Sequence, residues 1–294
     1  MAEDNFEKKV IGLGYIECEI SQLTDLILLK KLESTYPIKL ISTQTFKDKA
    51  LAIYSLTYGG GLVSGDSYKL VIKVGENATL SLLTQASTKV YKKRQNHSVV
   101  NASVNTSIKI RDFDVIQSLT CYLNQNSLFC LLPEPVTNLI ILDWFTSGRM
   151  SNGEVWKFEK YCSLNQLFLL KDGDCKDKIC IFNDCWLLED EHKGINSGET
   201  SYSDRVKPYQ CYGTLILYGA KLDVLKQNIL KLNADNIITG KALNLPPLIF
   251  SSSTFSNDNG LVVRVAALET ILLKNFILNC LDGLQKLIGK NIFI

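Results

Sequence analysis

The sequence predicts a mainly β protein in a single large domain over residues 1–294, with two α-helices in its C-terminal third. Apolar residues alternate with a period of two from about residue 50 to residue 185, as is typical of half-buried strands. Apolar residues spaced three and four apart appear only from about residue 221 onward. The length of 294 residues also suits an all-β protein built as one domain.

Two segments, 67–74 and 100–111, show the strand alternation most clearly. Gly75-Glu76-Asn77 separates the first of them from a further apolar run at 78–85. Asn183-Asp184 likewise divides two short apolar runs. We expect an antiparallel hairpin at each of these two interruptions, because polar and glycine residues between strands are typical of tight turns.

The two helices are predicted at about residues 221–233 and 270–288. Each has one apolar face with the spacing of a helix packed on a core. Between the strands and these helices, residues 189–205 are polar, contain glycine and hold few aromatic side chains. This stretch is predicted to be an exposed loop or insertion.

The composition excludes several kinds of partner. The chain has 32 basic and 30 acidic side chains, so its net charge of +2 provides no strong field for nucleic acid or anionic lipid. No segment approaches the roughly 18 apolar residues of a membrane span, and the first ten residues do not resemble a signal peptide. We therefore expect a cytoplasmic protein whose nine cysteines are free thiols.

The segment 58–66, YGGGLVSGD, concentrates three successive glycines between two apolar strands. Gly59, Gly60, Gly61 and Gly65 allow backbone conformations that other residues rarely adopt. The glycine spacing is that of a phosphate-binding loop, but Asp66 stands where such a loop needs lysine, so nucleotide binding is not expected. A structural turn and a functional site using Ser64 and Asp66 remain equally open on these residues alone.

Hydrolytic chemistry based on histidine finds little support. The chain contains only two histidines and no Gly-x-Ser-x-Gly sequence. We therefore do not expect a hydrolase of this histidine-dependent type.

The segment 58–66, together with five later blocks in the same order, resembles the urease accessory protein D family, which is also named H. The later blocks are 83–91 (LTQASTKVY), 132–137 (LPEPVT), 146–156 (TSGRMSNGEVW), 213–219 (GTLILYG) and 260–268 (GLVVRVAAL). The resemblance covers about residues 36–290 and is closer to eukaryotic than to bacterial members.

This resemblance implies an all-β scaffold whose strands wind in two layers in a helix-like arrangement, followed by two helices. It also implies the partners: urease accessory protein F, the accessory GTPase G and the urease apoprotein. The implied role is delivery of nickel to the urease active site, with no reaction on this chain, so we expect that it is not an enzyme. No tightly bound cofactor is implied, since nickel(II) would only be in transit.

A passage for nickel needs polar, preferably carboxylate, groups that form successive weak sites. The candidate carboxylates are Asp66, Glu134 and Glu154, which lie in the family-like blocks. A polar run in the second block supplies further candidates, namely Thr84, Gln85, Thr88 and Lys89. These four side chains either line the passage together with Ser64 or satisfy the glycine-rich turn.

Two other classes of function remain alternatives. A β-rich carbohydrate-active hydrolase could use Asp66 and Glu154 as an acid and base pair, provided that the two carboxyl groups face one open cleft. A purely structural β protein without nickel transit would instead tolerate replacement of both carboxylates.

Overall fold

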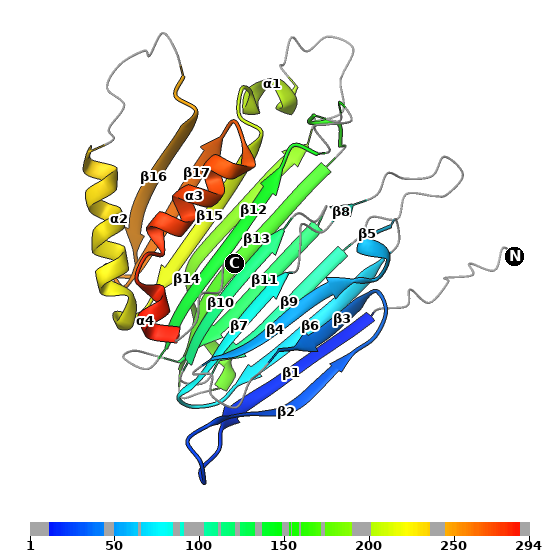
Figure 1. The fold of residues 1–294 in the computed structure, drawn as a ribbon, viewed down its shortest axis with the longest axis vertical. Helices are drawn as coiled ribbons and strands as arrows, with labels where there is room; N and C mark the ends of the chain where they lie inside the picture. Colours follow the sequence, from blue (N-terminus) through cyan, green and yellow to red (C-terminus); the bar gives the residue numbers. More distant parts are fainter. Residues whose placement is uncertain are drawn as a thin grey trace, which may run out of the picture.

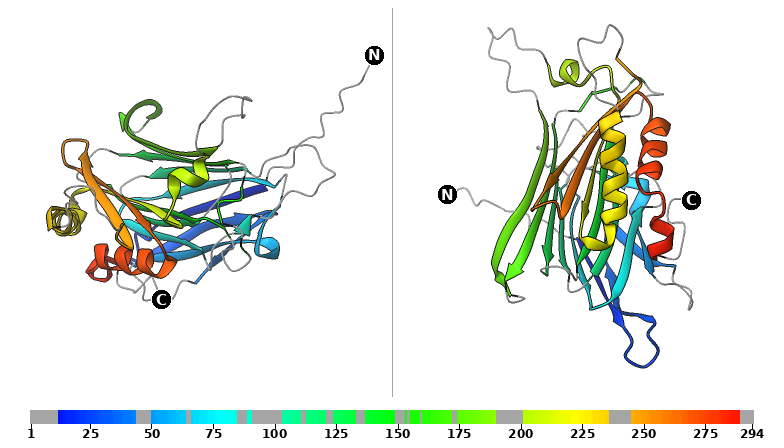
Figure 2. Two further views of the ribbon diagram at one scale, coloured as in Figure 1. Left: turned by 90° about the horizontal axis from the view of Figure 1, so that it is seen from above. Right: turned by 90° about the vertical axis from the view of Figure 1, so that its left-hand side faces the viewer.

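The computed structural model describes residues 12–43, 50–63, 66–84, 89–90, 103–110, 113–120, 124–132, 137–148, 153, 155–158, 160–171, 174–189, 201–235 and 245–288. Over these residues, two β-sheets lie face to face and the longer helices lie against one of them (Figure 1, Figure 2). The predicted mainly β class with few helices is confirmed.

The first sheet, here called sheet A, has the strand order β14-β13-β11-β9-β6-β1-β2 over the described residues. Its strands are β1 (Gly12–Ile20), β2 (Ile27–Ser34), β6 (Ser67–Val74), β9 (Ser103–Ile110), β11 (Asn124–Leu131), β13 (Lys160–Lys171) and β14 (Asp174–Glu189).

The second sheet, sheet B, has the order β16-β17-β15-β12-β10-β7-β4-β3 in the same part of the chain. Its strands are β3 (Ile38–Ser42), β4 (Leu51–Thr57), β7 (Ala78–Thr84), β10 (Phe113–Thr120), β12 (Asn138–Thr146), β15 (Cys211–Tyr218), β16 (Leu248–Phe255) and β17 (Gly260–Ala267). A separate short pair joins β5 (Gly61–Leu62) to β8 (Lys89–Val90).

Successive long strands from β6 to β13 alternate between the two sheets. As a consequence, neighbouring strands in the middle of each sheet run parallel, as in the pairs β6 with β9 and β7 with β10. Antiparallel pairs occur toward the ends of the sheets, as in β13 with β14 and β15 with β17. The chain thus winds helically through two layers, with antiparallel strands mainly where the winding begins and ends.

The hairpin predicted at Gly75-Glu76-Asn77 is wrong. β6 pairs with β1 and β9 in sheet A, whereas β7 pairs with β4 and β10 in sheet B. Asn77 has a φ of 56° within this turn, and the chain crosses from one sheet to the other there. The apolar side chains of both strands enter the same core between the sheets, so alternation alone cannot distinguish this arch from a hairpin.

The hairpin predicted at Asn183-Asp184 is also wrong. β14 continues through both residues and pairs along its length with β13. Its register shifts near Phe182, because Leu167 lies opposite Phe182 while Phe168 lies opposite Cys180. The polar pair therefore belongs to a long bulged strand, and Asp184 faces the other sheet.

The C-terminal helices agree with the apolar spacing. α2 (Asp223–Asp235) and α3 (Thr270–Cys280) pack on the outer side of sheet B, and Leu225, Ile229, Leu273 and Ile277 are buried there. The helix predicted to continue to residue 288 is interrupted after Cys280, and α4 (Leu284–Ile288) follows it. Gly283 lies at this interruption with a φ of 89°, a conformation that favours glycine and ends a helix. Over the described residues, no helix is long and apolar enough to span a bilayer.

The loop predicted at 189–205 is wrong at both of its described ends. Glu189 ends β14, and α1 (Tyr202–Val206) follows residues 190–200, which lie outside the described residues. Ser201 caps α1 by accepting a hydrogen bond from the Ser203 amide. Tyr202 and Val206 are buried, so this helix is fixed to the end of the sandwich rather than exposed.

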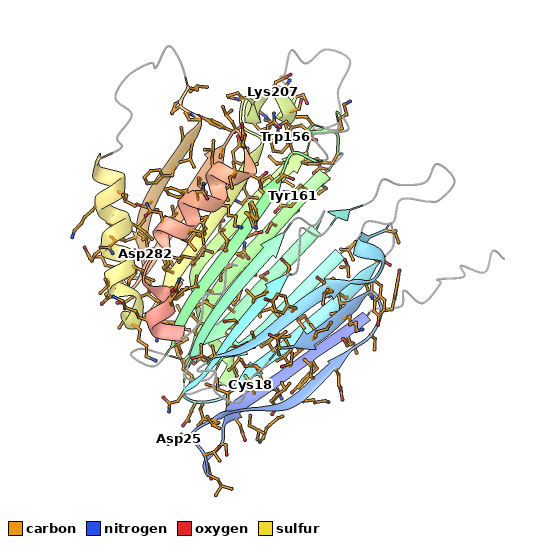
Figure 3. All side chains as sticks on the ribbon, in the orientation of Figure 1. Cys18, Asp25, Trp156, Tyr161, Lys207 and Asp282 are labelled. Carbon is orange, nitrogen blue, oxygen red and sulfur yellow. The ribbon has the colours of Figure 1, made fainter. Side chains whose placement is uncertain are left out.

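Three apolar clusters hold the described structure. The sandwich core fills the space between the sheets, and the outer core lies between sheet B and the helices. The aromatic cluster lies at the end of the sheets near α1, where Trp156 and Tyr161 are labelled in Figure 3. Its buried members are Phe145, Trp156, Tyr161, Leu188, Tyr202 and Val206. Cys18, a member of the sandwich core, lies toward the opposite end (Figure 3). Among the described residues, seven cysteines are thiols outside any disulfide: Cys18, Cys130, Cys162, Cys180, Cys185, Cys211 and Cys280.

Candidate functional site

The glycine-rich segment forms a tight turn between β4 and β6. Residues Tyr58–Gly60 make a short 3₁₀ turn, in which Gly59 and Gly60 have φ values of 70° and 74°. No other atom lies near the position of a Cβ at either glycine, so conformation alone requires glycine there. Gly61 has a φ of 174°, which is ordinary extended backbone, and pairs with Lys89 in the short β5–β8 ladder.

Asp66 closes this turn. Its Oδ2 accepts a hydrogen bond from the Val63 amide at 3.0 Å, and its Oδ1 accepts one from the Tyr36 hydroxyl at 3.1 Å. The side chain is buried, with 9% exposure. The hydrogen bond from Tyr36 raises the pKa of that phenol. Both carboxylate oxygens therefore have partners that hold the loop and join it to the segment before β3.

The structure describes only two of the remaining polar and acidic residues that were predicted for the site. Thr84 ends β7 and is half-buried, while Lys89 is brought beside the glycine-rich turn by the pairing of β8 with β5. Ser64, Gly65, Gln85, Thr88, Glu134 and Glu154 lie outside the described residues. The proposed roles of these residues stay predictions.

A second polar region, which the sequence reasoning missed, lies between the sheets. We call it the polar layer and define it by Asp143, Ser163, Asn165, Asp184, Thr214 and Arg264. On β12, Ile141 belongs to the sandwich core, Asp143 to the polar layer and Phe145 to the aromatic cluster. The same order of apolar, polar and aromatic side chains recurs on β13, β14 and β15. The polar layer thus crosses the sandwich between two apolar clusters.

Asp143 is the most deeply buried carboxylate of this layer, with 3% exposure. Its Oδ2 accepts hydrogen bonds from the Ser163 hydroxyl at 2.5 Å and from the Asn165 amide at 3.0 Å. Burial raises the pKa of Asp143, the two hydrogen bonds oppose that rise, and the negative charge of Asp184 adds to it. The fold therefore holds a carboxyl group where its charged form is disfavoured.

Asp184 occupies the outer part of the layer. Its Oδ1 accepts a hydrogen bond from Arg264 Nη2 at 2.5 Å, which forms an ion pair between sheet A and sheet B. Next to this pair, the Trp186 indole donates to the Thr214 hydroxyl at 2.9 Å. Both contacts connect β14 to sheet B, so the polar layer joins the sheets by directional bonds as well as by packing.

Three buried oxygen atoms of the layer have no hydrogen-bond donor: Asp143 Oδ1, Asn165 Oδ1 and Asp184 Oδ2. All three belong to acceptors, and two belong to carboxylates. Buried acceptors without donors cost free energy, and a proton, a water molecule or a cation can each supply the partner that they lack. Oxygen donors of this kind can bind nickel, although they hold it more weakly than sites that include imidazole or thiolate.

One signal in the sequence pointed to this layer. Asp143 interrupts the apolar run LIILDWF and alternates with residues that face the core. A carboxylate at such a position is almost never fully buried unless it is paired. The other members lie on four further strands, and only the register between these strands brings them together.

Comparison with known proteins identifies the family. The family model described as "UreD urease accessory protein" matches residues 14–292. The chain is 31% identical to urease accessory protein D of Arabidopsis thaliana, over 87% of this chain and 92% of that protein. It is 28% identical to urease accessory protein 4 of Cryptococcus neoformans, over 80% of each chain. It is 22% identical to urease accessory protein UreD of Bacillus cereus, over 82% of this chain and 80% of that protein.

These matches confirm the resemblance found on the sequence blocks, including its eukaryotic-like character. The family model covers nearly the whole chain, so the polar layer and the glycine-rich turn both lie within the matched region. The chain belongs to the UreD family of urease accessory proteins, whose role lies in urease maturation.

Proposed function

We propose that this chain is a cytoplasmic, non-enzymatic scaffold that binds the urease apoprotein together with accessory proteins F and G and helps to deliver nickel to the urease active site. Its place in urease maturation follows from the family. The polar layer is the part of the molecule proposed to contact the metal, and Glu134 and Glu154 remain candidates for the rest of the passage. Asp66, the third candidate carboxylate, is proposed to act through the glycine-rich turn, because both of its carboxylate oxygens accept hydrogen bonds there.

The observation that carries this proposal is the group of unpartnered acceptor oxygens on Asp143, Asn165 and Asp184. A layer needed only for stability would be expected to satisfy its acceptors, because replacing buried polar groups with apolar ones is often neutral or stabilising. The layer holds two buried carboxylates, Asp143 and Asp184, and the Arg264 guanidinium pairs with Asp184, so one negative charge is in excess whenever both carboxylates are ionised. Such a place attracts a cation.

The composition of the layer suits passage better than storage. It offers two carboxylates, an amide and two hydroxyl groups, and no group of three or more His, Cys, Asp or Glu side chains that could hold a metal occurs among the described residues. A cargo ion must leave each site that it visits, so a few weak oxygen donors serve transit.

Urease activation tests the proposal. Asp143→Asn keeps the shape of the side chain and removes its charge, and we expect it to lower the nickel content and activity of urease matured with it. Glu189→Gln is the matched control, because Glu189 lies on β14 in an exposed ion pair with Lys160. Pull-down of the partners establishes that each variant still assembles. Full activation by a folded, assembled Asp143→Asn variant would remove the polar layer from the nickel route.

The hydrolase alternative receives little support from Asp66. Both of its carboxylate oxygens accept hydrogen bonds within the turn, whereas a catalytic acid or base must reach its substrate. Its proposed partner Glu154 lies outside the described residues.

A further inference from the structure

We propose that Arg264 is a displaceable counter-cation that occupies the outer end of the polar layer until a divalent metal ion takes its place. This inference rests on the proposed passage of nickel through the layer. It adds a regulatory element, because the same guanidinium that neutralises the empty site would compete with the incoming ion.

The position of Arg264 supports this role. β17 lies next to β16, which ends the strand order of sheet B, and β14 ends the order of sheet A over the described residues. The Arg264–Asp184 pair therefore joins the sheets near one border of the sandwich. Thr214 and then Asp143 follow Arg264 across sheet B in register, leading inward from this pair.

The exposure of the two partners differs in the way that a displaceable cation requires. The Arg264 side chain is 43% exposed, whereas that of Asp184 is 8% exposed. A long side chain with its stem near the surface can turn its guanidinium outward into water without moving the backbone. The buried carboxylate cannot follow it, so it would stay behind with a free oxygen.

Lys226 shows what a fixed cation looks like in this fold. The Lys226 side chain is only 5% exposed, pairs with Asp223 at 2.7 Å and donates to the Asn259 carbonyl at 2.8 Å. Several partners of different kinds hold this ammonium group in a structural position. The contact that the structure gives for the Arg264 guanidinium is instead to the carboxylate of Asp184.

The charge arrangement makes displacement favourable. The Arg264 bond reaches only Oδ1 of Asp184 and leaves the Oδ2 of that residue without a donor, along with Asp143 Oδ1 and Asn165 Oδ1. A divalent ion at the layer could contact oxygens that the guanidinium does not satisfy. Repulsion between two cations near one carboxylate would then drive Arg264 outward.

Metal affinity of the full-length chain tests the inference, measured by competition for Ni²⁺ against a chromogenic chelator. Arg264→Gln removes the competing charge, so we expect it to bind Ni²⁺ at least about ten-fold more tightly than the wild type. Arg264→Lys keeps a charge with a less complementary head group and should bind with intermediate affinity. Lys160→Gln, which removes an exposed lysine from β13, the strand next to β14, should bind as the wild type does.

The outcomes separate this inference from the proposed function. Equal or weaker binding by folded Arg264→Gln, with binding by the wild type intact, would show that Arg264 only pins the sheets and would leave the nickel route standing. If Arg264→Gln does not fold, the decision passes to Arg264→Lys, whose affinity must exceed that of the wild type. If neither the wild type nor either Arg264 variant binds Ni²⁺, both the counter-cation and the nickel route are wrong.

Discussion

Arg264 of β17 donates to Asp184 of β14 at 2.5 Å and thereby joins two residues 80 positions apart across the two sheets. This bond lies between an apolar core and an aromatic cluster, on a layer that carries a second carboxylate, Asp143. The fold keeps this ion pair and the second carboxylate although apolar residues of similar volume would often stabilise a protein as well or better.

The coupling between these two residues can be measured directly. We expect Asp184→Asn and Arg264→Gln each to lower the free energy of unfolding by about 1–2 kcal/mol, a range that allows for the exposure of Arg264. The double variant should lose less than the sum of the two, because neither partner is then left without the other. Urea unfolding of the four proteins gives the coupling energy. Strict additivity would mean that the contact contributes nothing in solution.

Asp143 predicts an unusual dependence of stability on pH. Its pKa is raised in the folded state, so the folded protein holds this proton at pH values where the unfolded chain has already lost it. The contribution of the Asp143 proton to the free energy of unfolding is fully present below the ordinary carboxyl pKa. It is lost as pH rises through the raised pKa of the folded protein. Urea unfolding between pH 4 and pH 8, on the wild type and Asp143→Asn, measures this as a difference in slope.

The neutral variant Asp143→Asn should lack that loss and be more stable than the wild type at neutral pH, by about 1 kcal/mol or more. Its amide can also donate toward the unpartnered oxygens of the layer. A variant that is more stable but defective in nickel delivery would show that the carboxylate is retained for function. Lower stability of Asp143→Asn at neutral pH would contradict this account.

Asp66 is predicted to act mainly through the glycine-rich turn. Asp66→Ala removes two acceptors and should lower the free energy of unfolding by about 1–3 kcal/mol, whereas Asp66→Asn keeps one oxygen for the Val63 amide and should lose less. We expect Asp66→Asn to support urease activation as the wild type does. A folded Asp66→Asn variant that fails to activate urease would instead favour Asp66 as a nickel-passage residue.

Gly60 offers a test of the turn itself. Its φ of 74° disfavours a Cβ, and no neighbouring atom would clash with one. We expect Gly60→Ala to cost about 1–2 kcal/mol from backbone strain alone, and Gly60→Asn to cost less because asparagine tolerates this conformation. Thermal unfolding of the two variants gives the difference. Equal stability of Gly60→Ala and the wild type would mean that the turn adopts another conformation in solution.

The sequence was sufficient for the strand character of the middle of the chain, for the two C-terminal helices apart from the interruption after Cys280, and for the family, since each depends on local periodicity or on short blocks. It was insufficient for the path of the chain. Apolar residues alternate in 67–74 and 78–84 in the same way whether the two strands pair in one sheet or face each other from two sheets. In the structure the two strands lie in different sheets. Asp184 was assigned to a turn because a polar residue next to Asn183 is typical of one. Its place inside a strand is explained only by its partner across the sandwich, Arg264.

The candidate site shows the same limit. Asp66 was found because it stands in a conspicuous motif, but its partner Tyr36 lies 30 residues earlier in the chain. Asp143, Asn165 and Asp184 lie on three strands whose register depends on bulges and crossings. No local pattern joins them, and their unpartnered oxygens become visible only in three dimensions.

X-ray absorption at the nickel edge of the Ni²⁺-loaded full-length chain tests the central claim most directly. We predict a first shell of oxygen atoms without sulfur, and loss of that spectrum when Asp143→Asn is combined with Asp184→Asn. A sulfur-containing shell, or a spectrum that the two substitutions leave unchanged, would contradict the assignment of the polar layer to nickel.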